Sequence, residues 1–127
     1  MAIIAANNSG IEFKKILKIL PRITSVEGRL EKIGKIHNNS KVILDYAHTP
    51  AALESALSNL KEQFPFNKIN LIFGCGGDRD FKKRSLMGKI AEKYSNEIYL
   101  TDDNPRNEKP FEIRNEIKKG IKNKRIH

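Results

Sequence analysis

The sequence predicts an α/β protein with a largely parallel, Rossmann-like sheet and helices on both faces. Three short apolar runs, at residues 42–44, 69–73 and 98–100, have the continuous character of buried strands. Helical patterns separate these runs, so strands and helices alternate as in βαβ units. Parallel sheets of this kind bind ligands outside the carboxyl ends of their strands. We therefore expect functional residues in the segments that directly follow the runs.

Helices are predicted where apolar residues recur at helical spacing. Thr49 is a favourable N-cap for the first helix, with Pro50 in the first turn. The apolar stripes, which we interpret as core, are Leu53, Ala56, Leu57, Leu60 and Phe64, then Met87, Ile90, Ala91 and Tyr94, and finally Ile113, Ile117 and Ile121. Nearer the N-terminus, a short amphipathic helix is expected from Phe13 to Pro21. Residues 24–28 then form a linker into a strand near residues 30–36.

Composition narrows the class of protein. A chain of 127 residues with 39% hydrophobic content can form one packed domain. No apolar run is long enough to span a membrane, and the N-terminus lacks the features of a signal peptide, so we expect a cytoplasmic protein with no membrane partner. A single cysteine, Cys75, and three scattered histidines predict neither a disulfide nor a metal site, and Cys75 is interpreted as buried filler.

The charge is strongly basic, with 24 Lys and Arg against 15 Asp and Glu, a net charge of +9. Such an excess favours anionic partners in general. The only dense basic cluster, within residues 118–125, is interpreted as a solvated helix end. Aromatic residues do not alternate with basic ones in the way that base-stacking modules require, which argues against nucleic acid.

Each apolar run is followed by a polar segment. The last of these, Asp102-Asp103-Asn104-Pro105-Arg106, combines acids, an amide and a guanidinium, groups that together can bind a zwitterion. The alternative is an ordinary turn after a strand. The second segment, residues 74–80, is rich in glycine, but it lacks the third glycine of the dinucleotide fingerprint and the Lys-Ser/Thr of a Walker loop.

In order and spacing, these segments resemble the C-terminal domain of the MurE family of Mur ligases. This family comprises the UDP-N-acetylmuramoyl-tripeptide ligases of peptidoglycan synthesis that add meso-diaminopimelate. The resemblance covers approximately residues 10–120. Four motifs carry it. The first two are Glu27-Gly28-Arg29-Leu30-Glu31 and Asp45-Tyr46-Ala47-His48-Thr49-Pro50, and the others are Gly74-Cys75-Gly76-Gly77-Asp78-Arg79-Asp80, followed by Lys83-Arg84 and Leu86-Met87-Gly88, and Asp103-Asn104-Pro105-Arg106.

The resemblance implies a domain organisation. Residues 1–26 correspond to the tail of the family's central ATP-binding domain and a linker, and residues 27–127 correspond to the C-terminal domain, incomplete at its C-terminus. A Gly-Lys-Gly-His-Glu segment that the family carries near its amino-acid site is not in the sequence.

The resemblance also implies a substrate site. Arg79 is expected to hold a carboxylate of the incoming amino acid, although a salt bridge to Asp78 or Asp80 is the alternative. Arg106 is expected to pair with the distal carboxylate of meso-diaminopimelate, which lysine lacks. The remaining substrate-binding residues are Asp103 and Asn104, as acceptors for the substrate ammonium, and Pro105, which stiffens the turn.

A nucleotide-facing edge is implied at three residues. Asp45 is placed to hold a ribose hydroxyl and Arg29 to reach the phosphates. His48 either joins them or only lines the start of a helix. Phe81, Lys82 and Ser85 depart from the family pattern, which leaves the shape of the loop after Asp80 open.

The implied reaction is ATP-dependent amide ligation. The carboxylate of UDP-N-acetylmuramoyl-L-Ala-D-Glu is phosphorylated, and the amine of diaminopimelate attacks the acyl phosphate. ATP and Mg²⁺ are expected to bind mainly outside this chain, and we expect no catalytic residue and no metal ligand within it, so the isolated chain, a monomer, should be inactive. The alternatives are an inactive Mur-like fragment and a basic module that binds anions or nucleic acid.

Overall fold

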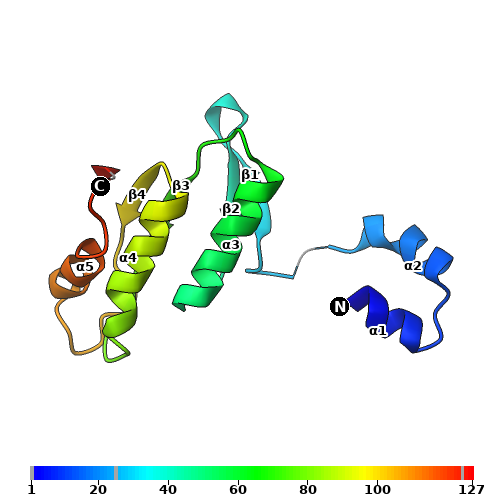
Figure 1. The fold of residues 1–127 in the computed structure, drawn as a ribbon, viewed down its shortest axis with the longest axis horizontal. Helices are drawn as coiled ribbons and strands as arrows, with labels where there is room; N and C mark the ends of the chain where they lie inside the picture. Colours follow the sequence, from blue (N-terminus) through cyan, green and yellow to red (C-terminus); the bar gives the residue numbers. More distant parts are fainter. Residues whose placement is uncertain (1, 25, 124) are drawn as a thin grey trace. The chain divides into compact units, whose positions relative to one another are not determined.

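The computed structural model describes residues 2–24, 26–123 and 125–127. The chain divides into two compact units, Met1–Asp45 and Tyr46–His127. Figure 1 labels most of the helices and strands that belong to them. Each unit has its own secondary structure and is described in turn.

The first unit contains short helices and a β-hairpin. Its helices are α1 (Ala2–Asn8), α2 (Phe13–Ile19) and the 3₁₀ turn η1 (Leu20–Arg22). The hairpin consists of β1 (Glu31–Lys35) and β2 (Lys41–Leu44), joined through the 3₁₀ turn η2 (His37–Asn39). The amphipathic helix expected after Phe13 is therefore confirmed, and Pro21 lies in the turn that follows it.

The pairing of β2 differs from the sequence prediction, which placed residues 42–44 in the parallel sheet. The strand pairs antiparallel with β1, with Glu31 opposite Leu44 and Lys35 opposite Lys41. The reason is the short connection at residues 36–40, because a parallel pair requires a crossover of a dozen residues or more. Asn38 and Asn39 both adopt positive φ, 59° and 58°, which asparagine tolerates better than most residues.

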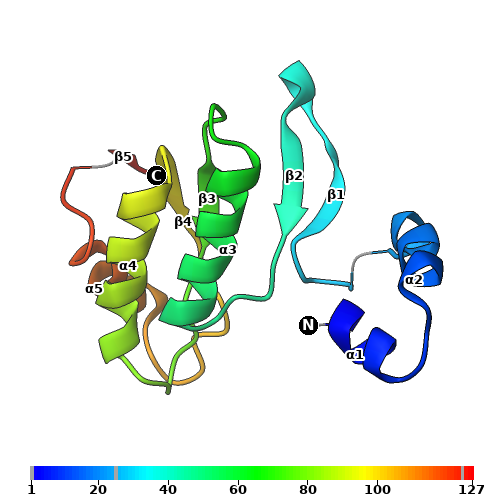
Figure 2. The ribbon, with the colours of Figure 1, turned by 45° about the vertical axis from the view of Figure 1, so that its right-hand side comes forward.

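The second unit is built around a three-stranded parallel sheet. The strands β3 (Asn70–Phe73), β4 (Glu97–Leu100) and β5 (Arg125–Ile126) lie in the order β3-β4-β5. The helices α3 (Pro50–Gln63), α4 (Lys82–Tyr94) and α5 (Pro110–Lys118) provide the connections and the packing. Helices α3 and α4 lie side by side along the strands (Figure 2). The predicted α/β class with a parallel sheet is confirmed.

The core of the second unit contains most of the residues that the helical stripes predicted, whereas Leu60 and Phe64 are only half-buried and lie outside it. Buried side chains from all three helices meet Ile98 of β4, and they include Leu53, Leu57, Met87, Ala91, Ile113 and Ile117. Ile121 is also buried, but it lies beyond the end of α5 and not within the helix. The prediction for Thr49 is confirmed, since its Oγ1 accepts a hydrogen bond from the Ala52 N–H at 3.2 Å. None of the helices in the described ranges is long and apolar enough to cross a membrane.

Candidate functional site

Two loops leave the same edge of the parallel sheet. We call residues 74–80, which follow β3, the glycine loop, and residues 101–108, which follow β4, the proline loop. Phe73 and Leu100 are register partners at the ends of these strands, and the Thr101 N–H donates to the Phe73 carbonyl at 3.1 Å. The loops therefore begin side by side, at the carboxyl edge where parallel sheets bind their ligands.

Backbone contact continues along the two loops. The Gly77 N–H donates to the Asn104 carbonyl at 2.9 Å, and the Arg106 guanidinium donates in return to the Gly77 carbonyl through Nη1. Arg106 adopts a φ of 48°, which turns the chain back at this point, and its N–H is held by the Asn104 side chain at 3.1 Å. Arg106 is thus fixed against the glycine loop by its backbone and by one end of its fork.

Asp103 lies on the same side of the glycine loop as Arg106. The position that a β-carbon would take at Gly76 is 3.6 Å from Asp103 Oδ2 and 4.0 Å from Arg106 Nη1. One oxygen of the Asp103 carboxylate accepts from the Asn104 N–H at 2.7 Å. An acid and a guanidinium therefore converge over Gly76, and both residues remain exposed to solvent.

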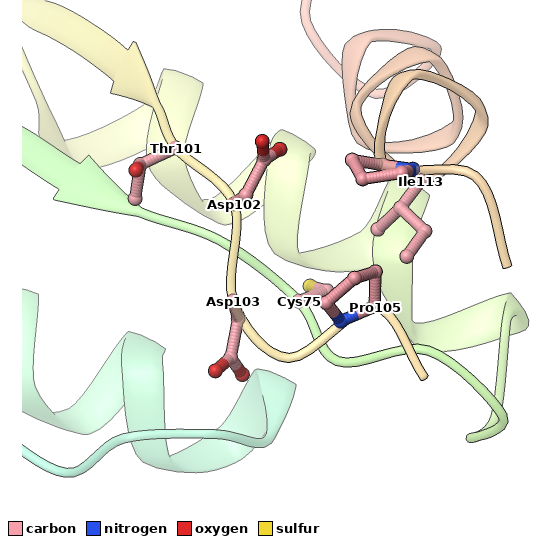
Figure 3. Close-up of a pocket in the computed structure, with 7 residues that line it drawn as sticks. Cys75, Thr101, Asp102, Asp103, Pro105 and Ile113 are labelled. Carbon is pink, nitrogen blue, oxygen red and sulfur yellow. The ribbon is translucent and has the colours of Figure 1, made fainter. Parts of the chain in front are cut away.

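The Asp102 side chain has a different role from that of its neighbour. In Figure 3, Asp102 and Asp103 point to opposite sides of the proline loop. Asp102 forms an ion pair with Arg114 of α5, which ties the proline loop to that helix. The depression lined by Cys75, Asp102, Asp103, Pro105 and Ile113 has almost no room for a water-sized sphere, whereas ligand pockets measure roughly 300–1,000 Å³. The candidate site is therefore the exposed surface of the two loops.

Arg79 does not make the salt bridge that was the alternative to substrate binding. The Asp78 carboxylate accepts from the Asn107 side chain at 2.7 Å, and the Asp80 carboxylate accepts from the Lys82 N–H at 2.9 Å at the start of α4. Arg79 is exposed and has no hydrogen-bond or ion-pair partner within the described part of the chain. Its guanidinium is consequently available to a ligand.

Arg84 is a residue whose importance sequence reasoning missed. It is 1% exposed and donates to both oxygens of Glu108, each at 2.7 Å, to Glu116 at 3.0 Å and to the Gly76 carbonyl at 3.2 Å. The hydrogen bonds with Glu108 raise the pKa of Arg84 above its ordinary value and lower the pKa of Glu108 to about 2. A signal was present, because Arg84 lies three and seven residues before the buried Met87 and Ala91 and so shares their helix face.

The predicted nucleotide residues are divided between the two units. In the first unit, Asp45 Oδ2 accepts from the Leu30 N–H at 2.9 Å, so the carboxylate lies beside the turn that carries the exposed Arg29. His48 belongs to the second unit. It is exposed, its Nδ1 is 3.2 Å from the Tyr46 carbonyl oxygen, and its ring meets the Tyr46 ring edge-on at 5.2 Å. The structure thus brings together Arg29 and Asp45.

Cys75 is buried, and its Sγ lies 3.7 Å from the Met87 Sδ. Burial raises the pKa of the thiol, which agrees with the interpretation of Cys75 as filler. Among the residues with described positions, no group of three His, Cys, Asp or Glu side chains could hold a metal ion.

Paired strand-end loops with exposed arginines define an α/β domain suited to an anionic small molecule. Comparison with known proteins identifies the family within this class. Residues 28–127 match the family described as Mur ligase, glutamate ligase domain, so the chain belongs to the Mur ligase family.

Known relatives share close to half of their aligned residues with this chain. The UDP-N-acetylmuramoyl-L-alanyl-D-glutamate–2,6-diaminopimelate ligase of Rickettsia felis is 46% identical over 122 residues, which are 95% of this chain and 22% of that protein. The enzyme of the same name from Wigglesworthia glossinidia brevipalpis is 48% identical over 123 residues, 97% of this chain and 24% of that protein. The chain therefore spans about a quarter of the length of these relatives.

Solved structures agree with this assignment. A structure of UDP-N-acetylmuramoyl-L-alanyl-D-glutamate–2,6-diaminopimelate ligase superposes with a TM-score of 0.71 at 38% identity, covering 99% of this chain and 26% of that one. The UDP-N-acetylmuramate-alanine ligase MurC of Thermotoga maritima superposes with a TM-score of 0.73 at 24% identity, covering 98% of this chain and 26% of that one. The second likeness concerns the fold alone.

Proposed function

We propose that this chain is the amino-acid-selecting part of an ATP-dependent ligase that joins meso-diaminopimelate to UDP-N-acetylmuramoyl-L-Ala-D-Glu in peptidoglycan synthesis. The relatives named above support the proposal, since their names describe a ligase that acts on diaminopimelate. The observation that carries it is the position of Arg106, which lies against the glycine loop beside Asp103. Its guanidinium donates to the Gly77 carbonyl through Nη1, and its other N–H groups remain for a ligand.

The two ends of diaminopimelate suit the two loops. Each end of this substrate carries an ammonium and a carboxylate. Arg106 pairs with the distal carboxylate and Asp103 and Asn104 accept from an ammonium, while Arg79 of the glycine loop holds a carboxylate. Pro105 limits the motion of the turn that carries Arg106.

Selection against lysine follows from the same groups. Lysine has the distal ammonium but only a hydrogen where diaminopimelate has its second carboxylate, so lysine would leave the Arg106 guanidinium unpaired and near a like charge that no carboxylate balances. A site built to bond a distinguishing polar group rejects analogues that lack it by large factors. Arg106 therefore determines specificity in this account.

The remaining parts of the reaction belong to other segments of the ligase. We propose that residues 1–26 are the tail of the central ATP-binding domain and a linker, in agreement with a family match that begins at residue 28. We further propose that Arg29 and Asp45 of the first unit, and independently His48 of the second unit, take part in nucleotide binding that domain closure completes. Phosphorylation of the dipeptide carboxylate by ATP takes place mainly on the central domain and forms ADP. The amine held by this chain then loses a proton and attacks the acyl phosphate, so that the amide bond forms and phosphate leaves.

The experiment uses the whole ligase that contains this chain. The enzyme is incubated with ATP, the UDP-linked dipeptide and either meso-diaminopimelate or lysine, and the products are identified by mass. We expect the diaminopimelate tripeptide to form with much higher efficiency than the lysine tripeptide. Failure to form an amide with diaminopimelate, or equal efficiency with lysine, would overturn the proposal.

A further inference from the structure

The buried guanidinium of Arg84 connects three segments of the second unit. Its Nη2 donates to the Gly76 carbonyl of the glycine loop, and both Nη atoms donate to Glu108 at the end of the proline loop. Nη1 also donates to Glu116 of α5. This ion pair differs from an ordinary exposed surface pair in two ways. Arg84 is 1% exposed, and its bond with Glu108 is bidentate.

The bonds continue from Glu108 back into the glycine loop. Glu108 Oε1, which accepts from Arg84, also accepts from the Asp78 N–H at 2.6 Å. Asp78 is the immediate neighbour of Arg79, and Glu108 lies two residues after Arg106. The two arginines expected to bind substrate are therefore linked through one buried guanidinium that is not itself exposed to ligand.

From this connection we infer that Arg84 is a positioning residue for amino-acid selection. It fixes the glycine loop and the proline loop relative to each other, and thereby the spacing of Arg79 and Arg106. The expected effect of Arg84 on substrate binding rests on the proposed function. A ligand with carboxylates at both ends is sensitive to such spacing, because small displacements of binding groups cost large factors in rate and affinity.

The chemistry of the guanidinium explains why an arginine is used here. A planar fork can bind both oxygens of Glu108 and still direct a donor to the Gly76 carbonyl. A lysine ammonium at the same position carries the charge but cannot hold the same directions. Arg84→Lys therefore separates the fork geometry from the charge.

The test compares three variants of the whole ligase with the wild type. Arg84→Lys replaces the planar guanidinium with an ammonium, and Glu108→Gln weakens the same bond from the side of the carboxylate. If one of these two variants fails to fold, the other still provides the test. Lys93→Met is the matched control, because Lys93 lies on the same helix in an exposed pair with Glu54 at 2.9 Å. Amide hydrogen exchange is measured without substrate, and KM is measured for each substrate.

We expect exchange in residues 74–80 and 101–108 to increase in Arg84→Lys and Glu108→Gln but not in Lys93→Met. The KM for diaminopimelate should rise at least about tenfold, by analogy with other supporting residues of binding sites. The KM values for ATP and the dipeptide should change by less than a factor of about two, because those sites do not depend on this spacing.

Two results would overturn the inference. One is unchanged exchange in both loops, which would mean that Arg84 does not hold them. The other is increased exchange with an equal effect on all three KM values, which indicates a general structural role. A wild-type ligase that does not use diaminopimelate would overturn the proposed function instead, and the exchange measurement would still decide whether Arg84 holds the loops together.

Discussion

The backbone of Gly77 packs against the carbonyl group of Pro105 so closely that a β-carbon at residue 77 would overlap with the Pro105 oxygen. The adjoining Gly77 N–H donates to the Asn104 carbonyl at 2.9 Å. Glycine at this position therefore serves the approach of two backbone segments to each other. This explains why a glycine-rich loop without the fingerprints of a phosphate loop follows β3.

Gly77→Ala should destabilise the 127-residue chain. The added methyl group must displace the backbone of the proline loop, and overpacking of this kind costs about 1–3 kcal/mol in the free energy of unfolding. Gly34→Ala is the control, since no atom lies within 4 Å of its β-carbon position. Urea denaturation of both variants measures the difference, and equal stabilities would contradict the packing at Gly77.

Acid should weaken the network around Arg84. The hydrogen bonds from Arg84, together with the Asp78 N–H, lower the pKa of Glu108 from 4.5 to about 2. A pKa that is lower in the folded state contributes stability that is fully present above the unfolded value of 4.5 and is lost as the pH falls toward about 2.

Glu108→Gln should therefore lower the stability at neutral pH and flatten its decline between about pH 4.5 and 2. Glu62→Gln is a suitable control, because Glu62 has no hydrogen-bond or ion-pair partner among the described residues. Denaturant midpoints at a series of pH values provide the measurement. An unchanged pH profile in Glu108→Gln would show that Arg84 does not hold the carboxylate in solution.

The isolated 127-residue chain should release no phosphate from ATP in the presence of both other substrates. Its sequence has no Walker loop, and the strand-end Asp45 with Arg29 offers only part of a nucleotide site. Titration with ADP should accordingly show a Kd no tighter than about 1 mM, or roughly 4 kcal/mol of binding free energy. Turnover, or a micromolar Kd for ADP, would be incompatible with this division of the ligase.

Removing a side chain that binds a group shared by diaminopimelate and lysine should lower kcat/KM for both substrates. In the whole ligase, Arg79→Ala and Asp103→Ala are expected to reduce kcat/KM for the two amino acids by similar factors, about tenfold or more for a charge-assisted bond. Steady-state kinetics with each amino acid checks this. A loss confined to diaminopimelate in either variant would reassign that residue to the distal end of the substrate.

Much of the fold could be predicted because local patterns and tertiary packing agree. The stripe that contains Met87 and Ala91 lies on the buried face of α4, and Thr49 caps α3 as its side chain predicts. The two polar segments after β3 and β4 could be placed together, since neighbouring parallel strands end at one edge.

Other features could not be read from the same patterns. The apolar character of residues 42–44 predicts a strand of the parallel sheet, and the short connection at residues 36–40 is the signal for a hairpin instead. Arg84 entered only as part of the Lys83-Arg84 motif, and its role could not be predicted because its acidic partners Glu108 and Glu116 lie 24 and 32 residues away. Helix α1 was not predicted at all.

The central claim is that Arg106 reads the distal carboxylate of diaminopimelate, and the most direct test is the ratio of kcat/KM for diaminopimelate to that for lysine in the whole ligase. Arg106→Ala should lower the value for diaminopimelate by about ten- to a hundredfold, the equivalent of a charge-assisted hydrogen bond worth roughly 1.5–3 kcal/mol. The value for lysine should change little, since lysine has no carboxylate at that end. Arg106→Lys should recover little, because an ammonium cannot reproduce the fork. Equal losses for the two substrates would contradict the account and assign Arg106 to shaping the turn after Pro105.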